Sequence, residues 1–489
     1  MERVLSTLWD ILVAFWPHLL TGMTLLIGLT ASGHVILHKR DVRSAIAWVG
    51  LIWLAPISGA ILYAWLGINR IHRRARTLRQ RHPLPIGFAD ARACPYQTSG
   101  NRPPFDNHLC SLARLIEQIS GRTLFPGNQL TVLDSDTPCY PIMLEAIEQA
   151  TTSVSLATYI FDNDRAGRAF LEALTRAVKR GVEVRVLIDG VGIRYSWPSI
   201  ARPLQQAGIP FARFLPRLMP GVYPYANLRN HRKIMVVDGH LGFTGGMNIR
   251  EGHWRDLNPA YPIEDLHFRV EGPVVAHMQD VFAEDWFFST HETLDGDPWF
   301  PSLNPVGNVY SRGISDGPDI DFDKLRLTLL GALACARSSV RIVTPYFLPD
   351  SALITAMSVA AMRGVEVDVV LPQENNLRLV QWASTALLWQ ILEHGCRVWL
   401  SPPPFDHTKL MVVDGTWTLL GSTNWDPRSL RLNFEFNLEC YDRELADRLE
   451  KLIATKIRMA SRLTQKNVDG RSLPRKLRDG VARLLSPYL

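Results

Sequence analysis

The chain has 489 residues, of which 47% are hydrophobic and 20% are charged, and its formal net charge is +6. This length exceeds what one ordinary core accommodates, so two domain-sized units and an appendage are expected. The six cysteines show no Cys-x-x-Cys or Cys/His ligand spacing, so neither a disulfide framework nor a metal site is predicted, whereas the positive charge suits nucleic acid or an anionic membrane.

Two runs without an acidic residue, lysine or arginine lie near the N-terminus, at about residues 11–37 and 44–69. A helix needs about 20 apolar residues to cross the hydrocarbon core of a bilayer, so each run is long enough to span it. Together they predict a transmembrane helical hairpin. The alternative is a cleaved signal peptide followed by a core helix, but the first run is too long for a signal peptide and lacks a small-residue cleavage site.

The charges that flank the hairpin predict its orientation. Six arginines lie between residues 70 and 81, and no acidic residue follows them before Asp90. Because basic residues accumulate on the cytoplasmic side, both termini are expected in the cytoplasm, although three basic residues in the turn oppose this assignment. We therefore predict a multi-pass protein of the inner (cytoplasmic) membrane. Residues 1–85 form the hairpin and a basic juxtamembrane segment, and residues 86–120 form a linker.

The rest of the chain contains a long internal repeat. Short β-branched runs alternate with helical stretches, which predicts α/β units. The matching segments are residues 153–161 (SVSLATYIF) and 339–347 (SVRIVTPYF), and residues 180–188 (RGVEVRVLI) and 363–371 (RGVEVDVVL). We therefore predict two similar α/β halves, residues 121–300 and 301–465, related by a pseudo-twofold axis that brings matching loops to one site.

Each half carries the same motif, His-x-Lys-x-x-x-x-Asp followed after six residues by Gly-x-x-Asn. Alternate side chains of a strand point to the same face, so the imidazole and the ammonium of each motif project together. A single copy would be an ordinary surface strand, but two copies at corresponding positions favour one shared catalytic site. The motif residues are His231, Lys233, Asp238 and Asn248 in the first half and His407, Lys409, Asp414 and Asn424 in the second.

These residue types suit phosphodiester chemistry without a metal or another cofactor. One imidazole can attack phosphorus while the other protonates the departing alkoxide, which divides one displacement into two easier steps. The lysines and the asparagine amides can stabilise charge on the non-bridging oxygens. The duplicated sequence does not by itself distinguish which histidine attacks.

The paired motif resembles that of the phospholipase D superfamily, and the resemblance covers about residues 125–465. Four further segments are similar to bacterial cardiolipin synthases: RSAIAW (43–48), APISGAILY (55–63), TPYFLP (344–349) and RSLRLNFE (428–435). The resemblance implies duplicated phospholipase D-type α/β domains preceded by the hairpin. It also implies a cofactor-free transfer in which one phosphatidylglycerol forms a phosphatidyl-histidine and releases glycerol, and a second phosphatidylglycerol then gives cardiolipin.

The resemblance assigns roles to the motif residues. By family precedent His231 is the nucleophile and His407 is first the acid and then the base. Lys233, Lys409, Asp238 and Asp414 complete the catalytic group, although the two aspartates precede turns and are expected to fix loops more than to touch substrate. Asn248, Asn424 and Ser422 are predicted to bind phosphate, and Gly246 departs from the serine that is usual in the family.

Each histidine is expected to have a carboxylate on its second ring nitrogen, which fixes its tautomer and orientation. Glu435, in the segment that resembles the family, is the candidate for His407 in the second half. Asp265 is the counterpart candidate for His231 in the first half, with an ordinary surface carboxylate as the alternative, because the insert at 251–261 blurs the alignment.

Two segments are candidates for contact with lipid. The loop 216–231 carries Leu218, Met219, Tyr223 and Tyr225 with Arg217 and Arg229, and either enters the membrane interface or packs on its domain. Residues 466–489 predict a basic amphipathic C-terminal helix, which either lies on the membrane or docks on the catalytic domain.

Three functions remain open from the sequence. The first is cardiolipin synthase, with phosphatidylglycerol, cardiolipin and the membrane as partners. The second is a phospholipase D-type hydrolase, or a transferase that uses another alcohol as acceptor. The third is a membrane-tethered nuclease, which the basic charge permits. Two membrane spans argue against nucleic acid as a partner.

Overall fold

The computed structural model describes residues 2–39, 42–67, 105–134, 136–215, 228–318 and 321–486. The chain divides into two compact units, Met1–Thr77 and Leu78–Leu489, each considered by itself. The arginine-rich segment 70–81 lies outside the described residues, as do residues 216–227 of the loop predicted to contact lipid.

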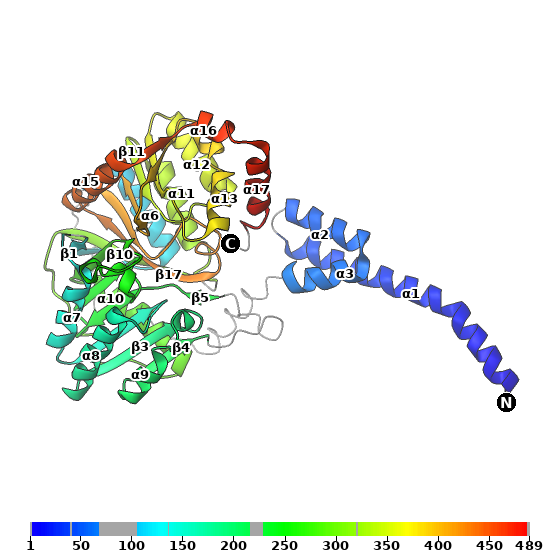
Figure 1. Ribbon diagram of the computed structural model, residues 1–489, viewed down its shortest axis with the longest axis horizontal. Helices are drawn as coiled ribbons and strands as arrows, with labels where there is room; N and C mark the ends of the chain where they lie inside the picture. Colours follow the sequence, from blue (N-terminus) through cyan, green and yellow to red (C-terminus); the bar gives the residue numbers. More distant parts are fainter. Residues whose placement is uncertain are drawn as a thin grey trace. The chain divides into compact units, whose positions relative to one another are not determined.

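The N-terminal unit begins with the long helix α1 (Glu2–His38) (Figure 1). Its segment Phe15–His38 has a mean hydropathy of 1.6 and is the one helix of the described residues that is long and apolar enough to cross a membrane. The second apolar run is divided into α2 (Val42–Leu54), α3 (Pro56–Leu62) and a π-helical turn (Tyr63–Gly67).

Pro56 is the reason for this division, because proline lacks a backbone N–H and is tolerated only in the first turn of a helix. After the break, α3 folds back so closely on α2 that a Cβ at Gly59 would lie 2.6 Å from the carbonyl oxygen of Leu51. The three helices contact one another around buried Val35, Ile52 and Tyr63. The second predicted span, 44–69, is therefore not one helix.

The second unit is built on a 16-stranded sheet whose strand order is almost a palindrome, β18-β13-β12-β11-β15-β16-β17-β10-β1-β9-β7-β6-β2-β3-β4. The order reads the same outward from the β10–β1 pair, with β17 opposite β9 and β11 opposite β2, as expected of two halves related by a pseudo-twofold axis. The first half contributes β1 (Phe125–Leu133), β2 (Ser153–Thr158), β3 (Glu183–Asp189), β4 (Phe211–Phe214), β6 (Ile234–Val237), β7 (Leu241–Gly245) and β9 (His267–Glu271). The second half contributes β10 (Val309–Asp316), β11 (Ser339–Val343), β12 (Glu366–Pro372), β13 (Arg397–Ser401), β15 (Leu410–Val413), β16 (Trp417–Gly421), β17 (Asn433–Tyr441) and β18 (Ser461–Leu463).

Helices cover the sheet in both halves (Figure 1). In the first half these are α7 (Cys139–Gln149), α8 (Arg165–Lys179), α9 (Ala201–Gln206) and α10 (Val275–Thr290). In the second they are α11 (Lys324–Cys335), α12 (Ser351–Met362), α13 (Arg378–Thr385), α14 (Trp389–Leu392) and α15 (Arg443–Met459). Each half has its own apolar core, in which fully buried strands such as β2 and β15 pack against these helices.

Two segments outside the predicted halves belong to this unit. Part of the predicted linker forms α6 (Asn107–Ser120), which packs on α11 because Leu109, Leu112 and Ile116 recur at helical spacing and are fully buried. The C-terminal segment forms α16 (Gln465–Asp469) and α17 (Leu473–Leu484), and α17 packs on α13. The linker prediction therefore extends too far, and the C-terminal helix docks on the second half.

Candidate active site

The two His-x-Lys pairs lie immediately before β6 and β15, in equivalent places of the two halves. All eight residues of these short strands are buried, since the sequences IMVV and LMVV are apolar throughout and the sheet is covered on both faces. The strands therefore hold the pairs rigidly. His231 and His407 keep relative exposures of 9% and 8%, and Lys233 and Lys409 are likewise buried.

Short strands tie each His-x-Lys pair to the opposite half. β5 (Arg229–Asn230) pairs with the start of β17, and the His231 N–H donates to the Phe434 carbonyl at 2.9 Å. On the other side, β8 (Ile263–Glu264) pairs with β14 (Phe405–Asp406), and the His407 N–H donates to the Glu264 carbonyl at 2.7 Å. These crossed pairings bring both motifs into one site between the halves.

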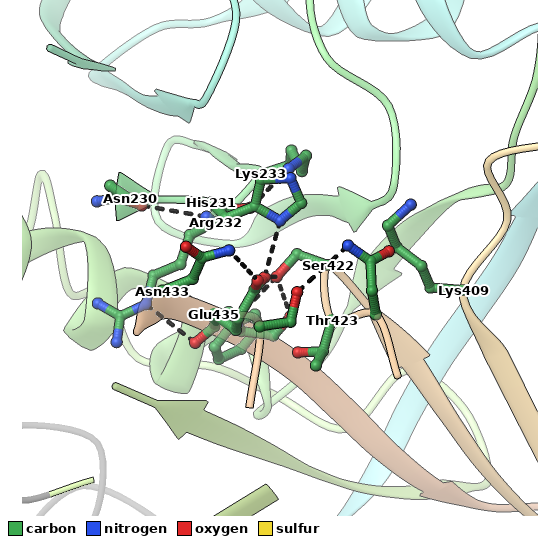
Figure 2. Close-up of polar contacts among 12 residues, drawn as sticks. Asn230, His231, Arg232, Lys233, Lys409, Ser422, Thr423, Asn433 and Glu435 are labelled. Carbon is green, nitrogen blue, oxygen red and sulfur yellow. Dashed lines mark hydrogen bonds and ion pairs between the residues drawn. The ribbon is translucent and has the colours of Figure 1, made fainter. Parts of the chain in front are cut away.

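The carboxylates that orient the histidines cross over in the same way. The Nδ1 atom of His231 lies 3.0 Å from Oε2 of Glu435, and Nδ1 of His407 lies 2.7 Å from Oδ2 of Asp265. Figure 2 shows the His231 ring directed at Glu435. The prediction that Glu435 serves His407 and Asp265 serves His231 is therefore wrong. Each carboxylate reaches the histidine of the opposite half because it lies beside the short strand that crosses from that half.

These contacts orient both rings. A carboxylate only accepts hydrogen bonds, so Nδ1 of His231 carries the proton and its Nε2 keeps a free lone pair. Nδ1 of His407 faces both Oδ2 of Asp265 and Nζ of Lys409, at 2.7 Å and 2.9 Å, which leaves its Nε2 directed away from these partners. Burial holds the pKa of His231 below its usual value although Glu435 opposes the shift, and burial together with Lys409 holds the pKa of His407 well below it. Both imidazoles are therefore neutral near neutral pH, as a nucleophile at phosphorus requires.

Each lysine can place positive charge beside the histidine of its own motif, and Figure 2 shows Lys233 next to His231. The Nζ atom of Lys233 donates to the His231 carbonyl at 2.7 Å and lies over the Tyr159 ring, and Nζ of Lys409 donates to the His407 carbonyl. Burial lowers the pKa of Lys233 to about 7 and that of Lys409 to about 8. A bound phosphate anion would favour their charged forms, so the pair is suited to the non-bridging oxygens of a phosphodiester.

Ser422, which was predicted to bind phosphate, contacts Glu435. The hydroxyl of Ser422 is fully buried and donates to Oε2 of Glu435, the same oxygen that faces His231, and it accepts from the Phe436 N–H at 3.0 Å. It therefore positions the carboxylate. At the equivalent place in the first half, a Cβ on Gly246 would lie 2.2 Å from Oδ1 of Asp265. Gly246 thus leaves the space that the Asp265 carboxylate occupies.

Because of this difference, we expect an exchange of side chains to be harmful at position 246 and largely tolerated at position 422. We expect Gly246→Ser to displace Asp265 and lower the catalytic rate by about 100-fold, because His407, the predicted acid, loses its orientation. Ser422→Gly removes the hydroxyl that bonds Glu435 and the Phe436 N–H but leaves the carboxylate its place, so it is expected to cost about tenfold or less. Steady-state rates of purified variants check this, with unfolding temperatures as the control. Equal losses in the two variants would contradict this account of Gly246.

The asparagines of the two motifs are both buried. Oδ1 of Asn248 accepts the Ile160 N–H at 3.2 Å, and Nδ2 of Asn424 donates to Ser429 at 3.2 Å. Each amide is thus held by its own half. Within the described residues, Oδ1 of Asn424 is buried without a hydrogen-bond partner. Contact of either amide with phosphate remains a prediction.

The aspartates of the motif lie at the far ends of β6 and β15, about 16 Å along the strand from the lysines. Asp238 accepts the N–H groups of residues 151–153, and Asp414 accepts those of residues 337–339 and the His108 ring at 2.8 Å. Both adopt a positive φ of 50°, which short polar side chains tolerate in turns. Their contacts fix loops, as their position before turns led us to expect, and a direct part in catalysis stays a prediction.

Replacing Asp238 by asparagine is expected to cost stability without lowering the turnover of the folded enzyme. Burial raises the pKa of Asp238, but the backbone hydrogen bonds outweigh it and leave the pKa below its usual 3.8. The carboxylate therefore stabilises the fold above about pH 4 and loses this contribution as the pH falls further. We expect Asp238→Asn to cost about 2 kcal/mol at pH 7 and less below about pH 3, measured by thermal unfolding. A pH-independent loss would contradict this.

Three ring side chains of the site were missed in the sequence. Tyr159 and Tyr346 lie 5.1 Å and 6.1 Å, centroid to centroid, from the rings of His231 and His407. They follow β2 and β11 in the two copies of the repeat, which was a usable signal. His253 lies 6.0 Å from His407, and within the described chain its Nδ1 is buried without a partner. It comes from the first-half insert, so the repeat could not reveal it.

His253, Asp265 and His407 form a group whose nitrogen and oxygen atoms lie within 4.8 Å of one another, close enough to hold a metal ion. However, Nζ of Lys409 lies 2.9 Å from Nδ1 of His407, and its charge opposes a cation there. The residues fit a hydrogen-bonded acid–base cluster better than a metal centre.

Comparisons with known proteins agree with this geometry. The family model described as cardiolipin synthase, PLD-like domain, matches residues 143–286 and 329–456. The chain is 30% identical to the major cardiolipin synthase ClsA of Bacillus subtilis, over 92% of this chain and 95% of that protein. It is 31% identical to cardiolipin synthase A of Pseudomonas putida (strain GB-1), over 97% and 98% of the two chains.

A solved structure of phosphatidylserine synthase from Haemophilus influenzae is similar to this fold. The structural match covers 78% of this chain and 100% of the synthase chain, with a TM-score of 0.61 and 16% sequence identity. At this identity the likeness concerns the fold alone.

Proposed function

The chain belongs to the cardiolipin synthase family of phospholipase D-like proteins, and we propose that it joins two phosphatidylglycerol molecules through a phosphatidyl-histidine. The observation that carries this proposal is the crossed pair of carboxylate-bound histidines. Each ring has Nδ1 engaged by a carboxylate of the opposite half and Nε2 available for phosphorus or for a proton. Two histidines in this state can share one displacement between them.

The first step forms the covalent intermediate. Nε2 of His231 attacks phosphorus, the bond from phosphorus to the glycerol oxygen breaks, and Nε2–H of His407 gives its proton to that oxygen. The low pKa of His407 describes the free enzyme. The negative charge of the bound phosphodiester favours protonation of this imidazole, so the acid form arises with the substrate. Lys233 and Lys409 stabilise the charge that develops on the non-bridging oxygens.

The second step reverses these roles. Nε2 of His407, now neutral, takes the proton of a hydroxyl of the second phosphatidylglycerol. The resulting oxygen attacks phosphorus, and the bond between phosphorus and His231 breaks. The products are cardiolipin and the unmodified enzyme, and the site is ready for another cycle. Water in place of the lipid hydroxyl would give phosphatidic acid, so transfer depends on which hydroxyl reaches the intermediate.

A single-substrate assay tests this function. The detergent-solubilised full chain is incubated with phosphatidylglycerol alone, and the variant that carries both His231→Asn and His407→Asn is the blank. We expect free glycerol and a four-chain lipid in equal amounts. Phosphatidic acid as the main product would identify a hydrolase. Product that appears only after another alcohol or lipid is added would identify a different transferase.

The enzyme is proposed to act at the inner (cytoplasmic) membrane. Attachment is supported by the 24-residue apolar segment of α1. The arginines between 70 and 81 support a cytoplasmic location of the second unit. The helices α2 and α3 have 13 and 7 residues, so each is shorter than the about 20 residues that a span requires. The multi-pass topology therefore remains a prediction.

A further inference from the structure

Two equivalent loops at the catalytic edge of the sheet carry exposed apolar side chains. β3 and β12 occupy matching positions, each parallel to the strand that precedes a site tyrosine. The loop after β3 presents Tyr195 and Trp197, with relative exposures of 56% and 96%. The loop after β12 leads into α13 and presents Leu377 and Leu379, with exposures of 49% and 45%.

In each half, one tyrosine side chain lies between the loop and the histidine. The hydroxyl of Tyr195 lies 3.4 Å from that of Tyr159, whose ring contacts His231. On the other side, the Tyr346 hydroxyl donates to Oδ1 of Asn376 at 2.9 Å, next to Leu377, and the Tyr346 ring contacts His407. The exposed apolar residues therefore flank the reacting groups symmetrically.

Helix α17 packs on α13, the helix into which the loop after β12 leads. Its inner side is fixed by buried Ala482 and by Asp479, which pairs with Arg471 and Arg478, and Arg478 lies over the Trp382 ring at 4.4 Å. In Figure 1, α13 and α17 lie on the same side of the second unit as β5, which leads to His231.

The outer side of α17 is apolar and its margins are basic. Four exposed residues recur at a spacing that aligns them on one face of a helix. They are Leu473, Leu477, Val481 and Leu484. Arg475, Lys476 and Arg483 are also exposed, whereas the single acidic residue of the helix, Asp479, is buried in its ion pairs.

We propose that this surface, the apolar rim, docks on a phospholipid bilayer and holds the catalytic edge against it. We define the apolar rim by Trp197, Leu377, Leu379, Leu477 and Val481. Trp and Tyr are favoured at the interface between hydrocarbon and headgroups, and an apolar helix face with basic margins suits an anionic lipid surface. The inference rests on the proposed function, because lipid substrates must enter the site from a bilayer.

The test compares lipid in bilayers with lipid in solution, using the full chain. Three variants are assayed: Trp197→Ser, Leu377→Ser with Leu379→Ser, and Leu477→Ser with Val481→Ser. We expect glycerol release from phosphatidylglycerol vesicles to fall by about tenfold, and release from a short-chain, monomeric phosphatidylglycerol to stay within about twofold. The control is Met362→Ser, a similarly exposed apolar residue at the end of α12, which comes just before the start of β12, whereas Leu377 follows the end of that strand. It should lower neither rate.

Equal losses on both substrates, or no loss on vesicles, would overturn the proposal. A second measurement needs no turnover. Trp197→Cys and Met362→Cys variants are labelled with a thiol-reactive fluorophore and reconstituted in vesicles that contain nitroxide-labelled phospholipid, with the unsubstituted chain as the background. Strong quenching at position 197 and weak quenching at 362 support bilayer contact. Equal quenching contradicts it. If the wild-type chain releases no glycerol from either substrate, the proposed function fails while the quenching result still decides the docking.

Discussion

Replacing either His231 or His407 by asparagine is expected to lower glycerol release from phosphatidylglycerol by at least about 10⁴-fold. In the proposed mechanism His231 forms the covalent bond to phosphorus, so its loss removes the nucleophile. Without His407 the glycerol leaves as an unprotonated alkoxide, which is a poor leaving group. His394→Asn, at an exposed position of the second half, is the matched control and should change the rate little.

The two variants should differ with an activated donor, and this difference assigns the roles. In a phosphatidyl p-nitrophenol, the leaving group departs without a proton. We expect His407→Asn to release one equivalent of nitrophenol rapidly and then stall, because the intermediate forms but no base activates the acceptor. His231→Asn should give no burst. The reverse pattern would make His407 the nucleophile, and a burst in both variants would contradict fixed roles for the two histidines.

The features that depend only on contacts inside one half could be predicted from the sequence. The duplication, the α/β class and the buried His-Lys pairs all follow from short repeated runs, whose spacing depends on local geometry. The break at Pro56 could also have been read, since a proline in the middle of an apolar run divides a helix. The hydropathy of the run did not reveal this break, because hydropathy shows how long an apolar run is and not whether it forms one continuous helix.

The features that join the halves could not be read in this way. Asp265 and Glu435 are equivalent in strand register, two residues before the partners of Gly245 and Gly421. Their identification as orienting carboxylates rested on the family-like segment around Glu435 and on the corresponding place of Asp265 in the first half, and it agrees with their contacts. Which histidine each one reaches depends on β5 pairing with β17 and β8 with β14, and two-residue strands leave no hydrophobic period. The nearest partner along the sequence was therefore the wrong one.

The crossed pairing has a consequence that distinguishes it from pairing within each half. Asp265 orients the proposed acid, His407, and Glu435 orients the proposed nucleophile, His231. Burial raises the pKa of Asp265 to about 6, whereas His231 outweighs burial and keeps the pKa of Glu435 below its usual value. Asp265→Asn and Glu435→Gln keep the shape and remove the charge, so each is expected to lower the rate on phosphatidylglycerol by about 10³-fold.

Only one of these losses should be recovered with the p-nitrophenol donor. Because that leaving group needs no acid, Asp265→Asn should form the intermediate at close to the wild-type rate, measured as the nitrophenol burst. Glu435→Gln should stay slow, since its amide no longer stabilises the charge that His231 acquires on attacking phosphorus. Glu435 is fully buried and also bound by Ser422 and Asn433, so thermal unfolding must show that both variants remain folded. If Glu435→Gln were recovered and Asp265→Asn were not, each carboxylate would serve the histidine of its own half, and the crossed site would be disproved.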